Sequence, residues 1–153
     1  TDEGGFSEEA FISALRQGRA FGTTGPLLRA TLEGRGPGER FEGDTGTLRV
    51  AVENAPWIPV NTIRVYVNGH RVQDRPTSGN QAAEFPLRFE KDSVITVEVE
   101  GEPGAIYEAV LPGFTPFAFS NPIFVDSDAD GEWTAPGLVA PLPATLRDPL
   151  QAP

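Results

Sequence analysis

Alternation between apolar and polar residues, interrupted at short intervals by Gly and Pro, is the feature that most constrains the fold of this chain. The alternation is clear in three segments: Leu28–Leu32, Leu48–Val52 and Ile63–Val67. Successive side chains of a β-strand point to opposite faces, so each segment is predicted to bury one face and expose the other. The 17 Gly and 15 Pro residues are distributed between such segments as turn formers. This spacing of strands and turns is typical of a β-sandwich.

Further strands follow from the same pattern. Asn68-Gly69 predicts a two-residue hairpin turn, because both positions of a type I′ turn have positive φ, and His70–Gln73 should then return antiparallel. Pro86 indicates that its strand lies at a sheet edge or contains a bulge. The prediction is an all-β protein, an immunoglobulin-like antiparallel β-sandwich of about seven or eight strands. The remaining predicted strands are Ala83–Phe89, Val94–Glu100, Ala105–Leu111 and Phe117–Val125.

One short N-terminal helix is predicted over Ser7–Gln17. Ser7 is a favourable N-cap, Phe6 and Phe11 occupy the positions of a hydrophobic staple, and Gly18 is placed to end the helix. An apolar stripe on so short a helix must dock on something larger. Its residues are Phe11, Ile12 and Leu15.

The sequence divides into three parts. Residues 1–25 form the helix and a junction, residues 26–133 form the sandwich, and residues 134–153 form a Pro-rich extended tail. Alternation stops at Trp133, and Ala140–Pro153 is predicted to have no fixed helix or strand. No apolar run approaches the roughly 18 residues of a membrane span.

Composition excludes several kinds of function. The chain contains no Cys, which excludes disulfides, thiolate metal sites and a cysteine nucleophile. A net charge of -10 argues against nucleic acid and anionic membranes as partners. The single histidine, His70, would be a general base only with a positioned partner, and an exposed turn residue is the other interpretation. No residue is therefore assigned a catalytic or cofactor-binding role.

An acidic motif follows the last predicted strand and matches the first half of an EF-hand-type calcium loop. Carboxylates stand at positions 1, 3 and 5, and Gly131 at position 6 permits the sharp turn. Gly137 occupies position 12, where the loop needs a bidentate carboxylate, so binding should be weak, about 10⁻⁴–10⁻³ M. The alternative is a solvated acidic turn without metal. The candidate Ca²⁺ ligands are Asp126, Asp128, Asp130 and the carbonyl of Glu132.

Aromatic residues offer a second candidate site, a platform on which a sugar would stack. The alternative is that they close the ends of the core, as aromatics of sandwiches commonly do. The four candidates are Trp57, Tyr66, Tyr107 and Trp133.

Three motifs in order give the chain a family resemblance. Leu15–Pro26 resembles the junction in carbaryl-hydrolase-like PHP-type metallohydrolases, where a short helix leads to Gly-Arg-x-Phe-x-Thr-Asn-Gly-Pro and Thr24 here replaces Asn. The segments Ala55–Val60, with Val65–Gly69, and Phe117–Asp126 are similar to the C-terminal domain of that family. The family's metal ligands lie in a catalytic barrel upstream, so none maps onto this chain. The resemblance implies that residues 1–25 are the helix and junction from the end of that barrel, with Ser7–Gln17 as its last helix.

Two functions remain open at this point. The resemblance implies a non-catalytic accessory domain that packs against a hydrolase barrel of the same protein or of another copy, or mediates assembly. This predicts an apolar patch near Phe11, Ile12, Leu15 and Phe21. The alternative is an independent secreted module that binds carbohydrate or protein and is stabilised by Ca²⁺. It predicts exposed aromatics aligned on one face or one loop end.

Overall fold

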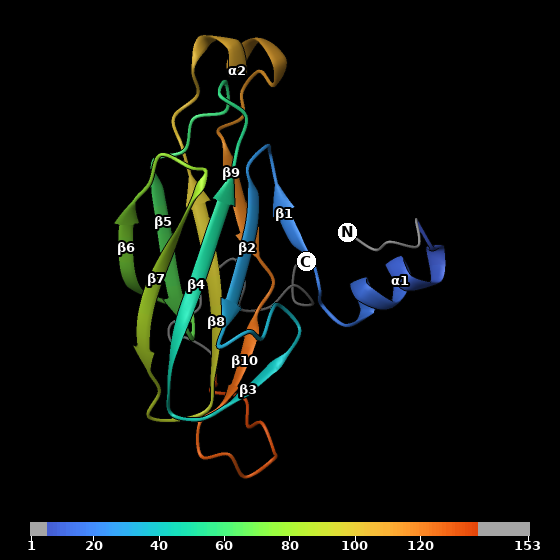
Figure 1. Cartoon of the computed structure of the whole chain (residues 1–153), viewed down its shortest axis with the longest axis vertical. Helices are drawn as coiled ribbons and strands as arrows, with labels where there is room; N and C mark the ends of the chain where they lie inside the picture. Colours follow the sequence, from blue (N-terminus) through green and yellow to red (C-terminus); the bar gives the residue numbers. More distant parts are fainter. Residues whose placement is uncertain (1–5, 138–153) are drawn as a thin grey trace, which may run out of the picture.

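The computed structural model describes residues 6–137 and shows two β-sheets packed face to face (Figure 1). Strands dominate, which confirms the prediction of an all-β sandwich. The described residues form ten strands rather than the predicted seven or eight, and one pair of them is parallel rather than antiparallel. The predicted extended segment Ala140–Pro153 lies outside the described residues.

The smaller sheet contains three antiparallel strands in the order β2-β4-β7. They are β2 (Leu27–Leu32), β4 (Thr45–Glu53) and β7 (Gln81–Arg88). Every second residue of β2 is buried, as its alternation predicts. Pro86 lies in β7, which is an edge strand of this sheet. An edge strand pairs on one side only, so it tolerates a residue that lacks an N–H. The prediction of an edge strand is confirmed.

The larger sheet has seven strands organised around β8 (Ser93–Glu100). One side of β8 pairs with β5, which in turn pairs with β6. The other side pairs with β9 at Glu98–Glu100 and with β10 at Ser93–Ile95. β1 extends the sheet beyond β9, and β3 pairs in parallel with β10. The bounds are β1 (Phe21–Thr23), β3 (Arg40–Glu42), β5 (Thr62–Val67), β6 (His70–Pro76), β9 (Phe117–Ser120) and β10 (Ile123–Asp126).

The single strand predicted over Phe117–Val125 is divided into β9 and β10. The break falls at Asn121-Pro122, and proline has no N–H to donate to a ladder. The hydroxyl of Ser120 accepts a hydrogen bond from Val97 N at 3.0 Å. This side-chain acceptor satisfies the central strand where the backbone ladder is interrupted.

The strand predicted over Ala105–Leu111 is wrong, because this segment forms the short helix α2 (Ala105–Val110). Apolar residues here occur in runs rather than in alternation, and the helix follows a Pro-Gly pair at Pro103-Gly104. Tyr107 is the buried residue of the helix, and its hydroxyl donates to Thr24 O at 2.9 Å. The helix lies at one end of the sandwich (Figure 1).

The predicted hairpin turn joins β5 to β6. Asn68 and Gly69 have φ of 53° and 77°, and the strands pair antiparallel from Val67↔His70 onward. Asn68 also accepts a bond from Val94 N at 2.8 Å. The turn therefore fixes the hairpin to β8 as well as reversing the chain.

The hydrophobic core lies between the two sheets. Aliphatic residues fill it from both inner faces, with Phe85 the largest fully buried side chain from the smaller sheet. Residues that are completely buried include Leu32, Leu48, Val50, Ile63, Val65, Phe85, Ile95, Val97, Val99, Ile123 and Val125.

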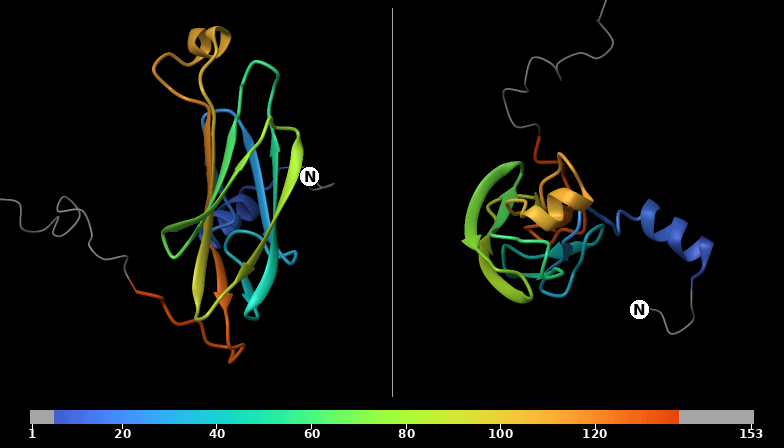
Figure 2. Two further views of the ribbon diagram at one scale, coloured as in Figure 1. Left: turned by 90° about the vertical axis from the view of Figure 1, so that its left-hand side faces the viewer. Right: turned by 90° about the horizontal axis from the view of Figure 1, so that it is seen from above.

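Helix α1 (Glu8–Arg16) stands outside the sandwich and has no buried residue (Figure 2). Its ends match the sequence: Ser7 Oγ accepts from Ala10 N, and Gly18 has φ of 72°. The rings of Phe6 and Phe11 are 5.9 Å apart, as expected for the hydrophobic staple. The chain after α1 enters the larger sheet as β1, so the sandwich includes residues before the expected boundary at residue 26.

Candidate functional site

Two features outside the core have functional potential: a cluster of carboxylates beside β10, and the exposed apolar side of α1. The carboxylate cluster forms because β8 and β10 pair antiparallel with Val125 opposite Ser93. This register places Asp126, at the end of β10, close to Asp92, just before β8. One carboxylate oxygen from each of Asp92, Asp126 and Asp128 lies within 4.8 Å of the other two. We call these three residues the aspartate cluster.

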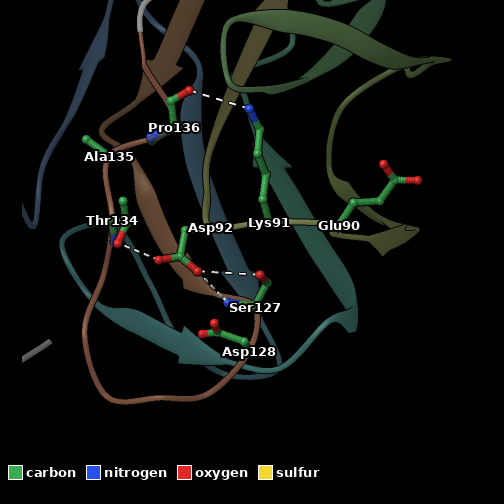
Figure 3. A pocket seen from close by; sticks show the side chains of 8 residues that line it. All are labelled: Glu90, Lys91, Asp92, Ser127, Asp128, Thr134, Ala135 and Pro136. Carbon is green, nitrogen blue, oxygen red and sulfur yellow. Dashed lines mark hydrogen bonds between the residues drawn. The ribbon is translucent and has the colours of Figure 1, made fainter.

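Asp92 organises the loop that follows β10. Its Oδ1 accepts from Ser127 N at 2.9 Å and its Oδ2 accepts from Thr134 N at 2.6 Å (Figure 3). Hydrogen bonds to the ionised carboxylate favour the charged form, so the Thr134 and Ser127 amides lower the pKa of Asp92. Asp92 thus connects the turn before β8 to two points of the loop.

Asp126 is completely buried. Its Oδ2 accepts from Gly131 N at 3.1 Å and lies 3.9 Å from Nη1 of Arg40. The same Arg40 nitrogen donates to Gly131 O at 2.7 Å. Asp126 Oδ1 is also buried but has no hydrogen-bond partner among the described residues. Of the two oxygens of this buried carboxylate, Oδ2 therefore accepts a hydrogen bond from the loop and Oδ1 does not.

The aspartate cluster overlaps the predicted ligand set only in part. Asp126 and Asp128 belong to both, whereas Asp130 and Glu132 are outside the cluster. Asp130 Oδ1 accepts from Glu132 N at 2.7 Å, in a local turn. Sequence reasoning missed Asp92, which lies 34 residues before Asp126 and comes close only through strand pairing. The available signal was an acidic residue directly before the strand β8.

The second feature is the apolar side of α1, which includes the predicted patch. Phe11, Ile12 and Leu15, which we call the helix stripe, are 52%, 39% and 50% exposed. Phe21, the first residue of β1, is 39% exposed. The helix stripe thus leaves a row of apolar side chains in contact with solvent rather than with the sandwich.

The segment joining α1 to the sandwich is held tightly although the helix is not. Asn121 Nδ2 donates to Gly18 O at 3.1 Å, and Arg19 forms an ion pair with Glu39 at 3.4 Å. Gly38 packs so closely against this segment that a Cβ there would overlap the Gln17 carbonyl. The end of α1 therefore has a defined position at the side of the sandwich.

Of the other sequence candidates, Trp57 and Tyr107 are brought together and the rest are not. His70 is exposed at the start of β6, and its side chain forms no ion pair or hydrogen bond with the described residues. Trp57 lies near Tyr107 at the α2 end, with ring centroids 6.4 Å apart. Trp133 instead packs edge-on against Phe124, 5.0 Å between centroids, beside the loop after β10. Tyr66 bonds Glu98 on the larger sheet at 2.7 Å.

Comparison with protein-family models, with curated proteins and with solved structures finds no match to this chain. Among the described residues, no helix is long and apolar enough to cross a membrane.

Proposed function

We propose that this chain is a non-catalytic accessory domain of a PHP-type metal-dependent hydrolase, with an immunoglobulin-like sandwich. In this proposal the helix stripe packs against the catalytic barrel of the same protein or another copy. The barrel supplies the metal ligands, and the present chain contributes none of them. The proposal rests on the resemblance at Leu15–Pro26 and on the exposure of α1.

The observation that carries the proposal is the contrast between α1 and the segment that follows it. The helix exposes Phe11 and Leu15 by about half, while Gly18 and Arg19 are bonded to the sandwich. An isolated helix of nine residues is marginal in water and is usually stabilised by burying its apolar face. A surface in the barrel would provide that burial, and the fixed junction would orient the sandwich on it.

Activity measurements test the proposal that catalysis belongs to the barrel and not to this chain. We expect the pure 153-residue chain to hydrolyse neither esters nor carbamates, with or without added divalent metals. A longer chain that carries the proposed barrel should hydrolyse one of these classes in a metal-dependent reaction. Metal-dependent turnover by the 153-residue chain, abolished by His70→Ala, would contradict the proposal.

The proposed interface is tested by a matched pair of variants. Leu15 belongs to the helix stripe, while its neighbour Arg16 is exposed beside it. In the longer chain, Leu15→Asp should lower the melting temperature more than Arg16→Asp, because burying an unpaired charge costs several kcal/mol. In the 153-residue chain the free energy of unfolding of both variants should lie within about 0.5 kcal/mol of the parent value, as is usual for surface substitutions. Equal melting temperatures of the two variants in the longer chain would exclude this interface.

The second candidate function is an independent secreted binding module stabilised by Ca²⁺. The aspartate cluster favours it, because it gives the module a place for a structural cation. The predicted aromatic platform does not assemble, since Trp57 and Trp133 lie at different parts of the sandwich. Binding of the 153-residue chain to a carbohydrate array, reduced by Trp57→Phe, would favour this candidate.

A further inference from the structure

We propose that Asp92, Asp126 and Asp128 form a Ca²⁺ site that fastens the loop after β10 to the turn before β8. The three carboxylates come from two segments that are distant in sequence but adjacent through the β8–β10 pairing. Their ligand atoms lie within 4.8 Å of one another, a spacing that suits oxygens sharing one cation at about 2.3–2.6 Å. This site differs from a loop that supplies all its ligands in sequence, because Asp92 is essential to it.

An unpaired buried oxygen distinguishes this cluster from an ordinary acidic surface. Asp126 is completely buried, and its Oδ1 has no hydrogen-bond partner among the described residues. A buried carboxylate oxygen without a partner is costly, and such groups are rare in folded proteins. Its second oxygen is fixed by Gly131 N, so the carboxylate has a defined orientation. A cation bound between the three aspartates would supply the missing partner.

The charge of the cluster points in the same direction. Among the described residues, Arg40 is the basic group that forms an ion pair with the cluster, with Nη1 at 3.9 Å from Asp126 Oδ2. Lys91, the neighbour of Asp92, directs its Nζ to Pro136 O at 3.5 Å (Figure 3). One guanidinium balances at most one of three carboxylates, so an excess of negative charge remains. Carboxylates held this close repel one another strongly, especially where one is buried.

The ligand chemistry favours Ca²⁺ over other cations. All three side chains offer hard oxygen ligands, which excludes a preference for zinc or copper. Ca²⁺ accepts irregular arrangements of 6–8 oxygens, whereas Mg²⁺ demands a nearly ideal octahedron. Asp128 is exposed and Asp92 is half-buried, so water has access to complete the coordination. Binding in the range of about 10⁻⁴–10⁻³ M is expected of such an incomplete site.

Thermal melting of the 153-residue chain tests the site. Five millimolar Ca²⁺ should raise the melting temperature by about 2–9 °C over a chelator, the shift expected for a dissociation constant of about 10⁻⁴–10⁻³ M in a chain of this size. Equimolar Mg²⁺ should give a smaller shift. The absence of a Ca²⁺ shift would overturn the site, and an equal or larger Mg²⁺ shift would overturn the assignment to Ca²⁺.

Variants test which residues bind the ion. Asp128→Asn should leave the fold intact, because the exposed carboxylate of Asp128 accepts no hydrogen bond from the described residues. This variant should weaken Ca²⁺ binding about 10-fold or more. Asp92→Asn should also weaken Ca²⁺ binding about 10-fold or more. Glu102→Gln is the matched control, since Glu102 is exposed next to α2, and it should leave the Ca²⁺ shift unchanged. An unchanged shift in both Asp variants would overturn the proposal.

Terbium luminescence locates the ion independently of stability. Trp133 Nε1 donates to Ser93 O at 3.2 Å, next to Asp92, so its indole should sensitise Tb³⁺ bound in the cluster. Trp57, the other tryptophan, lies near α2 and serves as the control. The Ca²⁺-displaceable emission should be lost in Trp133→Phe and kept in Trp57→Phe. The reverse result would place the cation elsewhere and overturn the proposal.

Discussion

Asn68 and Gly69 determine the geometry of an entire hairpin because both have positive φ. Gly69→Val should destabilise the chain by about 2 kcal/mol, since a β-branched residue is strongly disfavoured in this conformation. The melting temperature should fall by about 4–8 °C. Unchanged stability would contradict the turn geometry.

Asn68 contributes through its side chain as well. Its amide accepts from Val94 N and donates to Ser93 Oγ at 3.1 Å. A sequence signal identified the turn, because Asn-Gly is a local pattern, but these two bonds depend on a strand 25 residues away. Short-range geometry was therefore predictable here, and the connection to β8 was not.

Asp92 makes stability depend on pH in a direction that follows from its hydrogen bonds. The Thr134 and Ser127 amides lower its pKa in the folded chain, while the unfolded value is about 3.9. The folded chain therefore gains stability above the unfolded pKa and loses it as pH falls through the folded pKa. Arg40, Asp126 and Asp128 are the charged groups around this carboxylate.

The measurement is a melting curve in chelator from pH 6 down to pH 2, with Asp92→Asn for comparison. The parent should lose more stability than Asp92→Asn as pH falls below about 3.9, because only the parent protonates this carboxyl group. Parallel curves for the two proteins would contradict the prediction, because they would show that Asp92 has the same pKa in the folded and the unfolded chain.

Helices and strands were predictable where the local pattern was unambiguous. Alternation identified β2, β4, β5 and β8, and capping residues identified α1. The pattern failed at α2, where a short apolar run fits a helix as well as a strand and the burial of Tyr107 decides the outcome. It also joined β9 to β10, because the interruption at Pro122 becomes visible only in the ladder with β8.

Gly38 packs against the junction between α1 and β1, and Gly34 serves as its control. Gly34 and Gly38 have similar positive φ, 85° and 80°, but a Cβ at Gly34 would meet nothing, whereas one at Gly38 would overlap Gln17. Gly34→Ala should cost about 1 kcal/mol through backbone strain alone. Gly38→Ala should cost about 2–3 kcal/mol, because overpacking adds to the strain.

Melting temperatures of the two glycine variants provide the comparison. A similar loss in both would mean that the segment after α1 moves away from Gly38 without cost. The larger loss at Gly38 would confirm that the junction is packed on the sandwich.

At the scale of the whole molecule, the sandwich and the helix stripe differ in what stabilises them. The sandwich has its own core between two sheets. Alternation and turn signals in the sequence were sufficient to predict it. The helix stripe was equally visible as a pattern, but a pattern does not say what covers it. The aspartate cluster was visible in part, because Asp126 and Asp128 are close in sequence while Asp92 depends on strand pairing.

We propose that the helix stripe is an interface with a catalytic barrel, and amide hydrogen exchange across α1 tests this interface most directly. In the 153-residue chain the α1 amides should exchange rapidly, because the helix buries nothing, while β8 amides are protected. In a longer chain that carries the proposed barrel, exchange at α1 should be slowed about 100-fold or more. Equally rapid exchange at α1 in both chains would contradict it.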